Sequence, residues 1–125
     1  MATITEDYVS FETAKLLKEK GFDWDCITYY ANSKPNNVQY SMLFENNTSL
    51  GLRCCSAPTL QMAIKWLREV HNIDIFSWKI GKGIYSCAIF NSNTGQDLSL
   101  DKDFPTEKYE ETAEAAIKYC LENLI

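Results

Sequence analysis

The chain has a single histidine, His71, and none of the common motifs for phosphate-binding loops, nucleophile elbows or zinc-protease helices. Residues 1–7 lack the basic stretch and following apolar run that a secretory signal needs, so we expect no export. Apolar runs are short and broken by charges, and none approaches the roughly 20 apolar residues that span a bilayer. These absences predict a cytoplasmic protein that does not insert into membranes and carries no standard catalytic motif.

Paired cysteines at zinc-binding spacing are also missing. The chain has an odd number of cysteines at irregular intervals, which indicates free thiols in a reducing compartment. Cys54 and Cys55 are adjacent, and neighbouring side chains point in opposite directions in an extended chain. The sequence therefore predicts no metal site and no cofactor.

The composition is that of an ordinary globular domain. Of 125 residues, 46% are hydrophobic, 13% aromatic and 23% charged, which indicates one domain spanning 1–125. Seventeen acidic residues against twelve basic ones give a net charge of −5. Because this charge opposes attraction to phosphate backbones and anionic lipid, we do not expect nucleic acid as a partner.

Hydrophobic periodicity and turn residues divide the chain into elements. The predicted elements are helices at 10–21, 58–71 and 109–124, one hairpin of strands at 24–31 and 38–45, a second hairpin of strands at 73–80 and 84–90, a loop at 46–57 and a possible edge strand at 97–100. Their order, α-β-β-α-β-β-(β)-α, predicts an α+β domain. We expect an antiparallel sheet from the two hairpins with three helices, mainly on one face.

One candidate for chemistry is the thiol of Cys55, which lies just before the predicted helix at 58–71. A helix N-terminus stabilises a thiolate. His71, however, falls at the far end of the same helix, roughly 20 Å away at 1.5 Å per residue. We therefore favour an inert cysteine and predict no catalytic residue. A small-molecule binder or thiol enzyme using the 46–57 loop stays as the alternative.

Sixteen aromatic residues are more than alternation alone places inside the protein. Most aromatic side chains fill a core, and an excess can line an interface with a partner. Trp66 lies on the flank of its helix's apolar stripe, and we expect it to be buried. The leading hypothesis is a non-catalytic protein-interaction module that forms a homodimer. The candidate ligand or partner contacts are Trp66, Arg53, Cys55, Lys65 and Arg68.

Charge also varies along the chain. Residues 32–100 hold more bases than acids, whereas the segments before and after them are acidic. This distribution suggests that Lys65 or Arg68 faces acids of the last helix. Separate solvated faces are the alternative, and we favour them.

Three segments, 10–22, 57–71 and 109–117, carry a resemblance to small uncharacterised proteins of gut Bacteroidetes and their phages. The resemblance implies a phage or mobile-element origin and a cytoplasmic setting. It implies no particular activity and no catalytic residue.

From Pro58 onward, the order α-β-β-(β)-α is similar to the double-stranded-RNA-binding fold, and the terminal helix is similar to HicB-like antitoxins. This similarity suggests a regulator or antitoxin-like protein as a second alternative. The RNA-binding version needs lysines at the start of its last helix to meet phosphates. Here that stretch, Glu107 to Glu111, is mostly acidic, which disfavours RNA binding.

Overall fold

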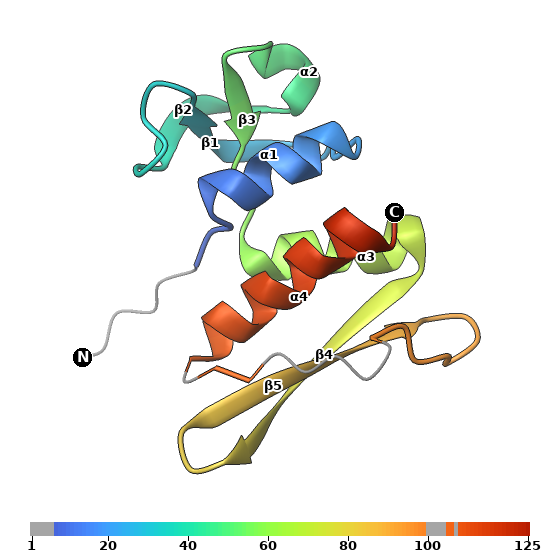
Figure 1. Ribbon diagram of the computed structural model, residues 1–125. Coiled ribbons are helices and arrows are strands. Elements are labelled where there is room, and N and C mark those ends of the chain that lie inside the picture. Colours follow the sequence, from blue (N-terminus) through green and yellow to red (C-terminus); the bar gives the residue numbers. More distant parts are fainter. Residues whose placement is uncertain (1–6, 100–104, 107) are drawn as a thin grey trace. The chain divides into compact units, whose positions relative to one another are not determined.

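The computed structural model describes residues 7–99, 105–106 and 108–125 (Figure 1). Within these residues it contains four helices and antiparallel sheets of three and two strands, which confirms the α+β class. The two hairpins thus lie in separate sheets. The chain divides into two compact units, 1–60 and 61–125. That 1–125 forms a single domain stays a prediction.

The first unit joins one helix to the three-stranded sheet. Helix α1 (Phe11–Glu19) is capped by Ser10, whose hydroxyl accepts a hydrogen bond from Thr13 N at 3.3 Å. Gly21, with a φ of 91°, follows the helix. The strands are β1 (Cys26–Ala31), β2 (Gln39–Glu45) and β3 (Cys54–Ser56). Their order is β2-β1-β3, with antiparallel pairing throughout, so the predicted first hairpin is present.

The expectation of a loop over 46–57 is wrong, because this segment holds helix α2 (Asn47–Leu50) and β3. The side chain of Asn46 caps α2 by accepting from Ser49 N at 2.9 Å, and the Ser49 hydroxyl accepts from Asn46 N in return. Asn47 is buried: it donates to Phe22 O at 2.7 Å and accepts from Ser56 N at 2.8 Å. Asn46, which the sequence places in a loop, therefore caps a helix, and Asn47 joins the segment to Phe22 and Ser56 by buried hydrogen bonds.

The second unit holds the β4–β5 hairpin and two long helices. These elements are α3 (Leu60–His71), β4 (Ile73–Gly81), β5 (Ile84–Asn91) and α4 (Tyr109–Asn123). Gly83, at a φ of 77°, lies in the turn between the strands. Beside β5, the edge strand expected at 97–100 is represented by one bridge, Phe90 to Asp97. Leu100 and Glu107, which entered the predictions above, lie outside the described residues.

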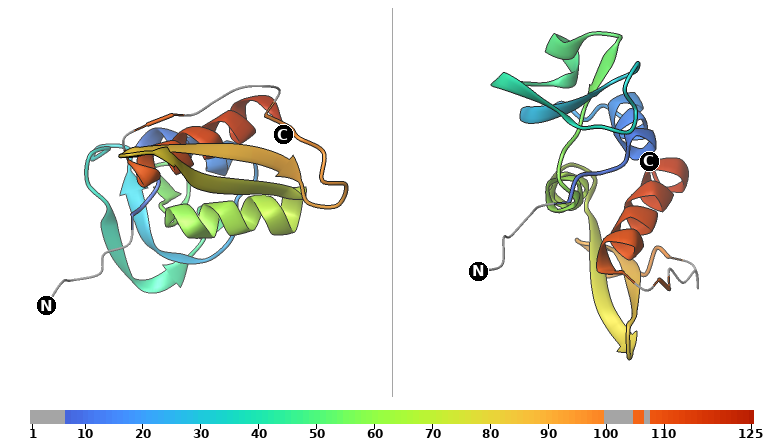
Figure 2. Two further views of the ribbon diagram at one scale, coloured as in Figure 1. Left: turned by 90° about the horizontal axis from the view of Figure 1, so that it is seen from below. Right: turned by 90° about the vertical axis from the view of Figure 1, so that its left-hand side faces the viewer.

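Helix α4 covers one face of the β4–β5 hairpin (Figure 2). The ring of Tyr85 packs edge to face on Tyr109 of α4, with centroids 6.2 Å apart. Residues that alternate with Tyr85 along β5 share its face, and they are Cys87 and Ile89, both buried. The buried side of α4 consists of Thr112, Ala113, Ala116, Ile117, Cys120 and Leu121. The opposite face of the hairpin therefore points away from α4.

Candidate interaction surface

Trp66 is a core residue. Only 1% of it is exposed, and its ring packs edge to face on His71 with centroids 4.8 Å apart. The expected burial of Trp66 is thus confirmed. Because its ring is inside the chain, it offers no surface to a ligand or partner.

Cys55 is also buried, and it lies in β3 opposite Tyr30. The helix that was expected to begin beside it begins at Leu60, so its backbone amides do not stabilise a thiolate at Cys55. Burial raises the pKa of the Cys55 thiol to about 11, and the nearby Lys18 ammonium only partly opposes this rise. Lys18 itself donates hydrogen bonds to the carbonyl oxygens of Gly51 and Cys54. At neutral pH the thiol stays protonated and is a poor nucleophile.

The three predicted basic contacts, Arg53, Lys65 and Arg68, are all exposed. Arg53 belongs to the turn before β3, where its carbonyl accepts a hydrogen bond from Asn32 N at 2.9 Å. Lys65 and Arg68 lie on α3. Arg68 Nη1 is 3.9 Å from Asp74 Oδ1 of β4, so its acidic neighbour is on a strand and not on the last helix. Within the second unit the structure pairs Arg68 with Asp74 and Trp66 with His71, whereas Arg53 and Cys55 belong to the first unit.

The described residues contain neither a metal-binding cluster nor a membrane-spanning helix. In this part of the chain, no group of three or more His, Cys, Asp or Glu side chains is placed to hold a metal ion. None of the helices found there has the length and apolar character needed to cross a membrane.

One exposed apolar surface lies on the β4–β5 hairpin, on the side away from α4. Phe76 and Trp78 alternate with Ser77 and share this side, and Phe76 packs edge to face on Phe90 at 5.7 Å. Phe76 is 56% exposed and Trp78 is 46% exposed. Two isoleucines near the turn are exposed as well. We call the surface formed by Phe76, Trp78, Ile80 and Ile84 the hairpin face.

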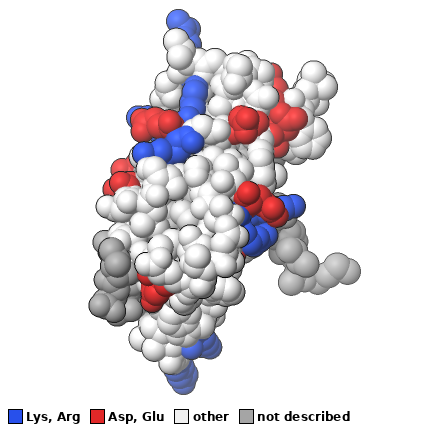
Figure 3. Space-filling model, turned by 90° about the vertical axis from the view of Figure 1, so that its right-hand side faces the viewer, with Lys and Arg blue, Asp and Glu red and all other residues white. Residues whose placement is uncertain are grey.

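The two ends of the hairpin carry opposite charges. Between Asp74 and Asp97 the only charged residues are Lys79 and Lys82, which lie at or near the turn and are called the tip here. Figure 3 shows basic side chains at this lower end and a mostly uncharged surface above them.

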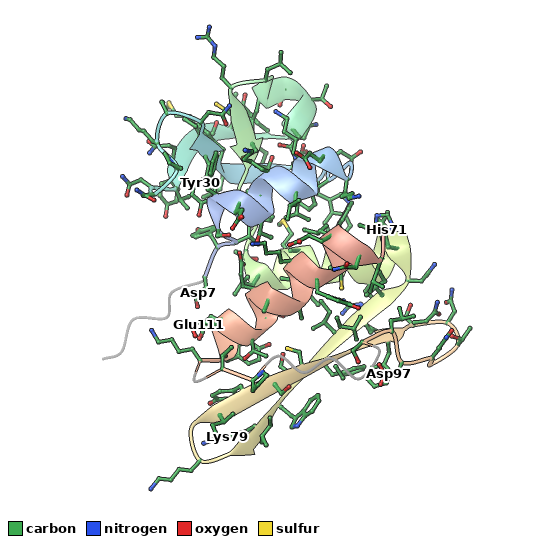
Figure 4. All side chains as sticks on the ribbon, viewed as in Figure 1. Asp7, Tyr30, His71, Lys79, Asp97 and Glu111 are labelled. Carbon is green, nitrogen blue, oxygen red and sulfur yellow. The ribbon has the colours of Figure 1, made fainter. Side chains whose placement is uncertain are left out.

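At the other end, Asp74 and Asp97 both pair with Phe90, on opposite sides of it, and this acidic end is called the base. Figure 4 shows Lys79 towards the tip and Asp97 towards the base. Hydrogen bonds from the hydroxyl and backbone N–H of Ser99 hold the pKa of Asp97 below its usual value. Asp97 therefore stays negatively charged at neutral pH.

A second apolar surface lies on β2, at the edge of the three-stranded sheet. The pairing of β1 with β2 is irregular, because Thr28 faces Tyr40 whereas Cys26 faces Glu45. The extra residues of β2 form a bulge, and Met42 within it is fully exposed. The exposed side chains of this β2 surface are Tyr40, Met42, Leu43 and Phe44.

Comparisons with known protein families, with curated proteins and with solved structures find no match to this chain. Neither exposed surface was singled out from the sequence, where the same apolar residues indicate only strands. Alternation places Phe76 and Trp78 on one face, and only the position of α4 shows that this face is the open one.

Proposed function

We propose that the protein is a non-catalytic protein-interaction module and that it forms a homodimer through the hairpin face. The observation that carries this proposal is the exposure of Phe76 and Trp78 on the side of the hairpin opposite α4. Large aromatic side chains that stand about half exposed on a regular strand lose contact with water when a partner covers them. Aromatic residues of this kind dominate the binding energy of many interfaces.

The size of the hairpin face suits a second copy of the chain. A half-exposed aromatic or large aliphatic side chain offers about 100 Å², so the four side chains together offer about 400 Å². A stable interface buries about 800 Å² on each partner. The hairpin face supplies half of that area as an apolar centre, and the charged residues of the tip and base supply a polar rim.

The other functions considered receive less support. The buried, protonated thiol of Cys55 and the ordered segment around it do not favour a thiol enzyme or a ligand-binding loop at 46–57. A regulator that binds nucleic acid is disfavoured by the net charge of −5. A cytoplasmic setting and a phage or mobile-element origin belong to the proposal through the resemblance of the helical segments.

The experiment is a mass measurement by light scattering or sedimentation equilibrium on the full chain and on two variants. We expect the wild-type chain to show about twice the 14.3 kDa of one chain at micromolar concentration. Trp78→Ser on the hairpin face should give a monomer. Leu43→Ser on the β2 surface, an equally apolar and more exposed site, should leave the dimer intact.

Circular dichroism of both variants checks that they fold. A wild-type chain that is monomeric at high micromolar concentration contradicts the homodimer. A dimer that Leu43→Ser dissociates and Trp78→Ser does not contradicts the hairpin face as the interface.

A further inference from the structure

We infer that the two copies stack their hairpin faces with their strands running in opposite directions, around a two-fold axis at Trp78. The tip of each copy then lies over the base of the other. This inference rests on the proposed homodimer and adds the orientation and the charged contacts that select it. In a two-fold interface the same pair of residues meets twice, so each such contact acts at both ends of the interface.

The spacing along β4 allows this superposition. Asp74 and Lys82 lie four residues before and after Trp78, or about 13 Å on each side at about 3.3 Å per residue. The pairing of β4 with β5 shifts between Lys79 and Gly81, which shortens the tip side slightly. A two-fold axis at Trp78 therefore brings Lys82 of one copy over Asp74 of the other.

Charge decides between the two possible directions of stacking. If the strands ran in the same direction, lysine would face lysine at the tips and aspartate would face aspartate at the bases. In opposite directions, Lys82 of each copy faces Asp74 of the other, with Asp97 beside it at the base. Lys79 pairs with Tyr85 and shares the face that α4 covers, so it takes no part in this contact. Opposite charges that face one another fix the orientation of an interface and speed its formation, and like charges disfavour the alternative.

The middle of the hairpin face carries no charge that would oppose this arrangement. Phe76 and Trp78 face Ala88 and Ser86 across the strands, so every side chain in these two cross-strand pairs is uncharged. The two copies of Trp78 meet at the axis, and each lies beside apolar side chains of the other copy. Affinity then comes mainly from the apolar centre, and orientation comes from the two charged ends.

Arg68, the basic neighbour of Asp74 within the same chain, does not prevent Asp74 from contacting Lys82 of the other copy. Arg68 is 3.9 Å from Asp74, and its side chain is 44% exposed, so this ion pair is weak. Asp97, the second acid of the base, is exposed, and among the described residues Ser99 of its own turn donates hydrogen bonds to it. Both carboxylates are available to a lysine of the other copy.

The test is a charge reversal followed by its rescue, with the dimer dissociation constant measured by sedimentation equilibrium on the full chain. At low salt, Lys82→Glu should raise the dissociation constant about tenfold, because an attractive contact becomes repulsive at both ends of the interface. Lys34→Glu makes the same charge change in an exposed turn of the first unit and should have no effect. At about 1 M salt the effect of Lys82→Glu should disappear.

Adding Asp74→Lys to Lys82→Glu should restore the wild-type constant, since the reversed charges again attract. If that double variant does not fold, Lys82→Glu with Asp97→Lys makes the same test. An unchanged constant for Lys82→Glu, or a failed rescue in a folded double variant, overturns the orientation and leaves the homodimer standing. A wild-type chain that stays monomeric overturns the homodimer itself.

Discussion

Replacing Trp66 by alanine should destabilise the protein strongly, although the sequence places this tryptophan at the margin of its helix's apolar stripe. The side chain is 1% exposed, so nearly its whole surface is removed from water on folding. At about 25 cal/mol per Å², the roughly 200 Å² of a buried indole corresponds to about 5 kcal/mol. Partial collapse around the site reduces this figure, and we expect Trp66→Ala to lower the free energy of unfolding by about 3–5 kcal/mol.

The matched control is Trp78→Ala, which removes the same side chain from a half-exposed position. It should cost about half as much or less at protein concentrations where the chain is monomeric. Urea denaturation followed by far-ultraviolet circular dichroism measures both changes without depending on tryptophan emission. A loss below about 1 kcal/mol for Trp66→Ala is typical of surface positions and would refute the assignment of Trp66 to the core.

Three further predictions concern the first unit and the buried thiols. Iodoacetamide at pH 7.5 should alkylate Cys55 more slowly than the partly exposed Cys54, because burial raises the pKa of Cys55 to about 11 and shields its sulfur. Mass spectrometry of the peptides measures both rates, and a faster reaction at Cys55 would contradict its burial. Folding stability should fall as the pH rises from about 9 towards about 11, because the thiols of Cys26 and Cys55 ionise near 9 in the unfolded chain and only near 11 in the folded one. The urea midpoint at each pH measures this fall in stability, which should be smaller in the Cys55→Ala variant. Asn47→Ala should lower the free energy of unfolding by about 2–4 kcal/mol, because it leaves Phe22 O and Ser56 N without their buried partner. The control, Asn93→Ala on an exposed turn, should leave the urea midpoint unchanged.

The segment around Asn46 and Asn47 shows where a local interpretation of the sequence fails. Asparagine, glycine and proline together indicate a loop, because each favours turns. A cap satisfies the first N–H groups of a helix by the same side-chain chemistry, so Asn46 fits either structure equally well. Only the buried partners of Asn47, which come from Phe22 and Ser56, show that the segment is held in place.

Cys55 shows the same limit at a candidate site. Its place before a helix suggested a stabilised thiolate, which depends on the helix beginning immediately after it. The helix begins at Leu60, and pairing with Tyr30 places Cys55 inside a strand instead. The environment of the thiol is therefore set by residues far away in the sequence, and its pKa rises where a helix N-terminus would have lowered it.

The sequence by itself determined the α+β class, both hairpins and the three long helices, because these follow from contacts within a few residues. The turn at Gly83 and the alternation of Phe76 and Trp78 with their polar neighbours are sufficient for the second hairpin. Only the tertiary structure decided which face of that hairpin is open. That choice depends on the packing of Tyr109 of α4 on Tyr85, between residues 24 positions apart, and no local pattern records on which side a distant helix will pack.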